Sequence, residues 1–212
     1  MDTYNNDDEQ VAAIKKWWQQ NGKSVVLGIT VGVGLIVGWQ AWQTHQLNAG
    51  IAASAAFAQV QTAVEAQQAE PIITAAEQLI AEHPNTVYAV LAGRQAAKQA
   101  YQQGDKAAAR VYLKNALQAA EDPTIQTAVR VQLATLLIDL QQWSEAETLL
   151  QADVDEAFAA EVATLRGDVA YHQGDTAAAY TAYQQAAALG GSGLLDLKIA
   201  ALQPATEPVE AQ

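Results

Sequence analysis

The sequence predicts an all-α protein in which a single N-terminal transmembrane helix precedes a domain of helical repeats stacked as a solenoid. Residues 25–42 read VVLGITVGVGLIVGWQAW and contain no charged side chain. Beyond residue 45 the chain is rich in Ala, Gln, Leu and Glu, which are strong helix formers, and it lacks β-branched runs of strand length. Residues 101–109 recur in similar form at 171–179, and this self-similarity indicates a repeat architecture.

Composition excludes several classes of function. The 212 residues contain no cysteine, so a disulfide framework, a thiolate zinc site and a cysteine nucleophile are all excluded. The chain has 11 Lys and Arg against 23 Asp and Glu, which gives a formal net charge of −12. A protein that binds a phosphate backbone needs the opposite sign, so we expect no nucleic acid partner.

Residues 25–42 are predicted to cross a membrane. A helix of about 18 to 20 residues spans roughly 30 Å of hydrocarbon and satisfies its own backbone hydrogen bonds there. Lysines before the span and tryptophans on both sides of it are typical of residues anchored at the membrane interface. These predicted anchors are Lys15, Lys16, Trp17, Trp18, Lys23, Trp39 and Trp42.

The distribution of cations sets the predicted orientation. Three lysines precede the span, and the next Lys or Arg after it is Arg94. The positive-inside rule therefore places residues 1–24 in the cytoplasm as a tail and residues 43–202 on the other side as the repeat domain. The last segment, 203–212, contains two prolines and is predicted to be disordered.

Two other interpretations of the span are open. A cleaved signal peptide is one, since the small residues at 52–55 resemble a cleavage site. Against it, the apolar run is longer than that of a signal peptide, and an acidic tail of 24 residues precedes it. A buried helix of a soluble protein is the other, and the lysine and tryptophan flanks argue against it.

Four glycines of the span have spacings that allow another helix to approach closely. Gly28 with Gly32, and Gly34 with Gly38, form two G-x-x-x-G pairs. Glycine is common in membrane helices, so both helix docking and simple tolerance of glycine remain open.

The repeat has a period of about 34 residues. Residues 101–109 read YQQGDKAAA, residues 171–179 read YHQGDTAAA, and residues 141–146 between them read QQWSEA. A period of this length with Gly-Asp in the turn resembles the tetratricopeptide repeat, a helix-turn-helix unit. Small or turn-forming residues would then be structural where paired helices meet. They are Ala97, Gly104, Ala109, Ala134, Ala146, Gly167, Gly174 and Ala179.

Cap and turn residues divide the repeat domain into helices. Pro84-Asn85-Thr86 and Asp122-Pro123-Thr124 are stop-and-cap signals, and Gly104 and Gly174 are predicted to follow helices with a positive φ. The first pair is expected to turn at Glu70-Pro71, and the second helix of the third pair is expected to be short. The predicted helices are 48–69, 71–83, 86–103, 105–120, 124–141, 143–152, 155–173, 175–189 and 193–202, the last of which closes the open end of the stack.

No constellation of residues points to catalysis. The three histidines lie in different segments and lack a second ligand at metal-binding spacing. The acidic residues Asp153, Asp155 and Glu156 lack the glycine of a calcium loop and are better explained as the start of a helix. We therefore expect a non-enzymatic protein that binds no metal and no cofactor.

Partner binding is expected on the concave side of the stack, which the first helix of each pair forms. Cations recur on these helices in an otherwise acidic domain. The candidates for a partner groove are Arg94, Lys98, Arg130 and Arg166. The alternative is that their stems are buried on the surface while their head groups are solvated. Tyrosines of the repeats, such as Tyr101 and Tyr183, either pack in the core or line the same side.

The layout as a whole resembles the YfgM family, whose members are ancillary subunits of the bacterial SecYEG translocon. Around the span, the resemblance is carried by Lys-Lys-Trp-Trp before Asn21-Gly22-Lys23, by Gly38-Trp39 and by His45-Gln46. In the repeats it is carried by Leu165-Arg166-Gly167 and Gly174-Asp175. It covers most of the chain, and the first 50 residues are its most specific part.

The resemblance implies a single-pass protein of the bacterial inner membrane with a periplasmic C-terminal domain. It also implies two partners, the SecYEG translocon and a membrane-anchored periplasmic chaperone similar to prolyl isomerases. The implied role is to help transfer translocated, unfolded client proteins to the periplasmic chaperones. The alternative is a membrane-tethered scaffold for the assembly of envelope complexes that binds no client.

Reporter fusions test the predicted topology. Alkaline phosphatase fused after residue 212 should be active, because that enzyme matures outside the cytosol, whereas the same enzyme fused after residue 24 should be inactive. An inactive C-terminal fusion would contradict the orientation. A product shortened by about fifty residues would instead support a cleaved signal peptide.

Overall fold

The computed structural model describes residues 3–191 and 194–202, and every regular element in that part of the chain is helical. The predicted all-α class is therefore confirmed. The segment 203–212, for which we predict disorder, lies outside the described residues. The chain divides into two compact units, 1–51 and 52–212.

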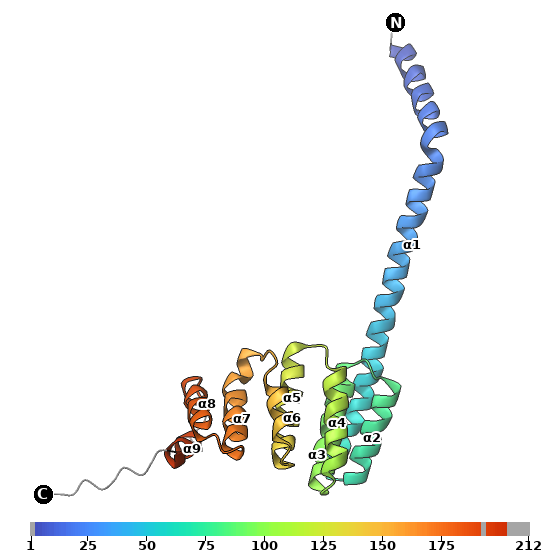
Figure 1. Ribbon diagram of the computed structural model, residues 1–212. Coiled ribbons are helices and arrows are strands. Elements are labelled where there is room, and N and C mark those ends of the chain that lie inside the picture. The colour runs from blue at the N-terminus through green and yellow to red at the C-terminus, as the bar shows by residue number, and fades with distance from the viewer. Residues whose placement is uncertain (1–2, 192–193, 203–212) are drawn as a thin grey trace, which may run out of the picture. The chain divides into compact units, whose positions relative to one another are not determined.

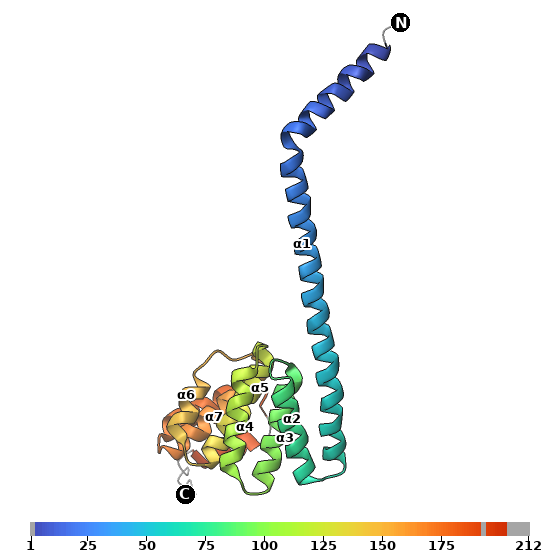
Figure 2. The same cartoon turned by 90° about the vertical axis from the view of Figure 1, so that its right-hand side faces the viewer.

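The first helix, α1 (Thr3–Glu65), is continuous through the span and into the second unit (Figure 2). We expected a separate helix at 48–69, but residues 43–51 contain no proline and continue the helical hydrogen bonding. α1 ends at a turn in which Gln67 has a φ of 55°, so the first turn is not at Glu70-Pro71. Pro71 is instead the third residue of α2 (Ala69–Glu82), where a helix has no internal partner for the missing N–H.

The first unit contains the candidate membrane span. α1 is the one helix within the described residues that is long and apolar enough to cross a membrane. All seven predicted interface anchors are exposed, and the rings of Trp39 and Trp42 lie 5.1 Å apart between centroids. The Trp18 indole covers Gly22, where an added Cβ would lie 3.2 Å from the ring. A Cβ at any of the four glycines of the span would meet nothing within 4 Å.

The second unit is a row of antiparallel helices (Figure 1). After α2 come α3 (Val87–Gln102), α4 (Lys106–Ala119), α5 (Pro123–Asp139), α6 (Trp143–Leu150), α7 (Ala159–His172), α8 (Thr176–Ala188) and α9 (Leu194–Leu202). From α2 to α9 each α-helix contacts the next one along the chain. The prediction of a short α6 is confirmed. The helix predicted at 155–173 begins instead with a 3-10 turn, Glu156–Phe158, ahead of α7.

Two turns in the row have the same chemistry, as the repeated Gly-Asp predicts. Gly104 and Gly174 both have a φ of 86°, a left-handed conformation that strains residues with a Cβ. The next residues, Asp105 and Asp175, cap α4 and α8, since each carboxylate accepts a hydrogen bond of 2.9 Å from a backbone N–H in the first helical turn.

The core follows the row as three successive clusters of buried side chains. Val60 of α1 packs with α2 and α3, a large middle cluster joins α3 to α7, and a last cluster around Tyr183 joins α8 to α7 and α9. All five predicted small alanines are buried (Ala97, Ala109, Ala134, Ala146 and Ala179). Each cluster is shared between neighbouring pairs, so each pair depends on the next for burial of its apolar surface.

Polar contacts join helices at separations close to the repeat length. Between second helices, Tyr112 donates to Glu77 at 2.5 Å and Arg110 donates to Glu145 at 2.8 Å, and both pairs are 35 residues apart. Burial and the bond to Glu77 raise the pKa of Tyr112 to about 12. Two further contacts, 38 residues apart, join the first helices α3 and α5 and are described below.

The Gly167→Ala variant tests the close approach of α7 and α8. A Cβ at this position would lie 2.4 Å from the Tyr183 ring, which is buried and whose hydroxyl donates to Asp168. We expect the free energy of unfolding, measured by urea titration in detergent, to fall by about 1 to 3 kcal/mol through overpacking. The control is Gly50→Ala, whose Cβ would meet nothing within 4 Å and which should cost no stability. Equal stability of the two variants would contradict the assigned role of Gly167.

Candidate protein-binding groove

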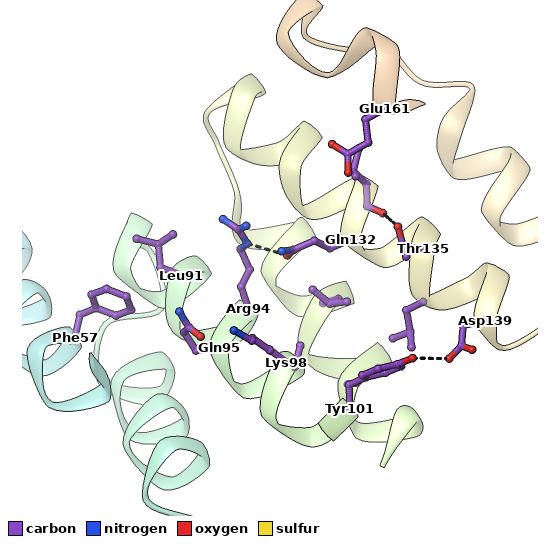
Figure 3. A pocket seen from close by; sticks show the side chains of 15 residues that line it. Phe57, Leu91, Arg94, Gln95, Lys98, Tyr101, Gln132, Thr135, Asp139 and Glu161 are labelled. Atoms are coloured by element: carbon purple, nitrogen blue, oxygen red, sulfur yellow. Dashed lines mark hydrogen bonds between the residues drawn. The ribbon is translucent and has the colours of Figure 1, made fainter. Parts of the chain in front are cut away.

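A groove of about 520 Å³ lies across the first helices α3 and α5 (Figure 3). Its floor is apolar and consists of buried side chains, namely Ala97, Ala109, Leu113, Val131 and Leu136. Its walls are partly or fully exposed and mostly polar: Phe57, Leu91, Arg94, Gln95, Lys98, Tyr101, Gln132, Thr135, Asp139 and Glu161. An apolar floor with polar walls suits an extended segment of another protein.

Two of the four predicted cations line this groove. Arg94 and Lys98 lie one turn apart on α3 and are labelled together in Figure 3. Arg94 donates from Nε to Oε1 of Gln132 on α5 at 2.8 Å. Partial burial of the side chain lowers the pKa of Arg94 below its ordinary value, but an arginine stays charged at neutral pH.

The other two predicted cations bind backbone carbonyls outside this groove. Arg130 donates from Nη1 to the carbonyl oxygen of Asp153 at 2.8 Å. Arg166 donates from Nε and Nη2 to the carbonyl oxygen of Leu150, the last residue of α6, at 3.1 and 2.6 Å. Together they hold the chain at and after the end of the short α6 against α5 and α7.

One end of the groove carries an internal charge cluster. Tyr101 donates to Oδ2 of Asp139 at 3.2 Å, and Lys106 approaches the same oxygen at 2.7 Å. The hydrogen bond from Lys106, and then that from Tyr101, lowers the pKa of Asp139 below its ordinary value. The bond to Asp139 raises the pKa of Lys106 in turn. The charge of Asp139 is thus already compensated within the chain.

The tyrosines divide between the groove and the core. Tyr101 is exposed and lines the groove, whereas Tyr183 is buried against Gly167. Sequence reasoning missed Phe57, Gln132 and Glu161, which also line the groove. Each of the three lies in a predicted helix, but no sequence motif marks it as a binding residue.

The described residues contain no candidate metal centre. In that part of the chain no three His, Asp or Glu side chains come together in an arrangement that could hold a metal ion. The acidic residue Asp155 caps the 3-10 turn instead, accepting from the N–H of Ala157 at 2.9 Å and from the Thr124 hydroxyl at 2.5 Å. The bond from Thr124, and then that from Ala157, lowers the pKa of Asp155 below its ordinary value.

The Lys106→Gln variant tests the charge cluster. Removing the ammonium group should raise the pKa of Asp139 toward the ordinary value of about 3.9, measured from the carboxyl carbon shift by NMR. The folded pKa is the lower one, so the stabilisation from this ion pair is present above the unfolded pKa and is lost as the pH falls through the folded pKa. The matched control, Lys114→Gln, removes a lysine that pairs with Glu145 and should leave Asp139 unchanged. A shift in both variants would point to a general charge effect.

Comparisons with known proteins agree with this architecture. The family described as a tetratricopeptide repeat-like domain matches residues 15–204. A protein of Escherichia coli named ancillary SecYEG translocon subunit is 33% identical over 184 residues, which cover 87% of this chain and 88% of that protein. A protein of Haemophilus influenzae with the same name is 32% identical over 180 residues, covering 85% and 88% of the two chains. The chain therefore belongs to the YfgM family of ancillary SecYEG translocon subunits, whose repeat domain is tetratricopeptide-like.

Proposed function

We propose that this chain is a non-enzymatic, membrane-anchored subunit associated with the SecYEG translocon. The observation that carries the proposal is the similarity, over most of both chains, to proteins named for that association. The candidate span in α1 supplies an anchor, and the groove on α3 and α5 supplies a surface for a protein segment.

The finer part of the proposal concerns orientation and partners. The lysines before the span favour a cytoplasmic N-terminus and a periplasmic repeat domain in the bacterial inner membrane. In that position the domain meets chains as they leave the translocon. We propose that it binds a membrane-anchored, prolyl-isomerase-like chaperone and assists the transfer of unfolded client proteins to the periplasmic chaperones.

The glycines of the span are proposed to pack against a helix of the translocon or of the chaperone. The positions where their side chains would lie are open within this chain, since an added Cβ at Gly28, Gly32, Gly34 or Gly38 meets no atom within 4 Å. Backbones approach most closely at such positions, where van der Waals contact and interhelical hydrogen bonds drive association in a membrane.

Co-purification from mild detergent tests the proposal. The full chain should retain the channel subunits and the chaperone, and the double variant Gly32→Leu with Gly38→Leu should retain less, because leucine keeps the helices apart. The matched control is Val31→Leu with Val37→Leu, which has the same spacing on the same exposed helix.

Membrane insertion of both double variants should equal that of the wild type, since each stays apolar. Equal loss in the two variants would assign the effect to bulk in the span, and no loss in either would remove the glycines from the interface. Absence of channel subunits from the wild-type preparation would contradict the proposed function itself.

A further inference from the structure

We propose that the groove on α3 and α5 selects an extended protein segment that carries a carboxylate side chain, and that Arg94 and Lys98 bind that carboxylate. This inference rests on the proposed function, because it names the chemistry of the partner segment that the groove receives. The observation behind it is which cations of the second unit pair with other groups of the chain and which do not.

Six of the eight cations in the second unit have partners within the chain. Four of them pair with carboxylates: Lys106 with Asp139, Arg110 and Lys114 with Glu145, and Lys198 with Asp168. Arg130 and Arg166 bind backbone carbonyls. These contacts are expected in an acidic protein, where each cation has many carboxylates within reach.

Arg94 and Lys98 are different. Neither pairs with a carboxylate among the residues that the structure describes, and the bond from Arg94 to Gln132 uses only Nε. The two terminal nitrogens of the guanidinium remain available, which leaves donors that a carboxylate can accept from. Two cations one turn apart on α3 thus line the groove without an ion pair to any carboxylate in the described part of the chain.

The surroundings of Arg94 favour binding of an anion over exposure to water. The Arg94 side chain is partly buried, and that burial lowers its pKa because it removes water from the charge. A carboxylate brought into the groove restores hydrogen bonds that burial has removed, and charge-assisted bonds of this kind are the stronger ones. The apolar floor and Phe57 at one end add contact for an apolar side chain near the acidic one.

The other acidic residues of the groove decide where the carboxylate binds. Asp139 is compensated by Lys106, so it does not neutralise Arg94 or Lys98. Glu161 lies on α7, away from the labelled cations of α3 in Figure 3, and it disfavours a second carboxylate on that side. The acidic residue of the bound segment therefore lies over α3. A polyanion is disfavoured because the whole chain has a net charge of −12.

Binding of short synthetic peptides to the full chain in detergent tests the inference. The peptides share one apolar background and differ at a central position, which is Glu, Gln or Lys. We expect the Glu peptides to bind about tenfold more tightly than the Gln peptides, as a charge-assisted bond implies. The advantage should shrink at high salt, because the site is partly exposed.

Two variants and one matched control complete the design. Lys98→Gln should reduce the preference for Glu, and Arg94→Glu with Lys98→Glu should reverse it in favour of Lys peptides. Lys114→Gln removes the same charge on α4 outside the groove lining and should bind like the wild type. If the charge-reversed variant does not fold, the double variant Arg94→Gln with Lys98→Gln replaces it. This variant should abolish the preference for Glu peptides.

Three outcomes would overturn the inference: no peptide binds, the wild type shows no preference for Glu, or the preference survives both groove variants. Co-purification of the channel subunits is measured on the same preparations. Loss of the Glu preference while channel subunits are retained would reject this inference alone. A Glu preference without any channel subunits would reject the proposed function and keep the chemistry of the groove.

Discussion

Close approach of helix backbones is the constraint on which the repeat domain depends. The sequence predicts small side chains at the helix crossings, and the five alanines predicted there are all buried. At Gly167 the approach is so close that the Tyr183 ring occupies the space of a Cβ. Small side chains bury little area each, so the stability of the domain comes from many short contacts distributed along the row.

The groove is a consequence of the same packing. Two polar contacts hold the first helices α3 and α5 beside each other, Arg94 with Gln132 and Tyr101 with Asp139, both 38 residues apart. The second helices are held by their own pairs at a separation of 35 residues. Because these contacts fix both the first and the second helices, a groove stays open across α3 and α5. Its floor consists of residues of the middle core cluster.

The acidic composition and the repeated contacts between helices together explain why few cations remain for a partner. Most cations of the repeat domain hold neighbouring helices together or bind the carbonyls around the end of α6. Arg166 satisfies the carbonyl of Leu150, the last residue of the short α6, and Arg130 binds the carbonyl of Asp153 in the segment that follows it. Arg94 and Lys98 belong to a pair with two full-length helices, so no such repair is needed there.

The sequence by itself determined the helical class and most helix ends, and it marked the candidate span, because these depend on local chemistry. Gly104 with Asp105 and Gly174 with Asp175 specify their turns through φ and a carboxylate cap, whatever surrounds them. Only the tertiary structure decided that α1 continues to Glu65. It also decided that Arg130 and Arg166 bind backbone carbonyls outside the groove. It also decided that Phe57, Gln132 and Glu161 line the groove. Helical periodicity assigns a residue to one face of its helix, but the partner of that face depends on how far neighbouring helices extend, and this is a property of the packed chain.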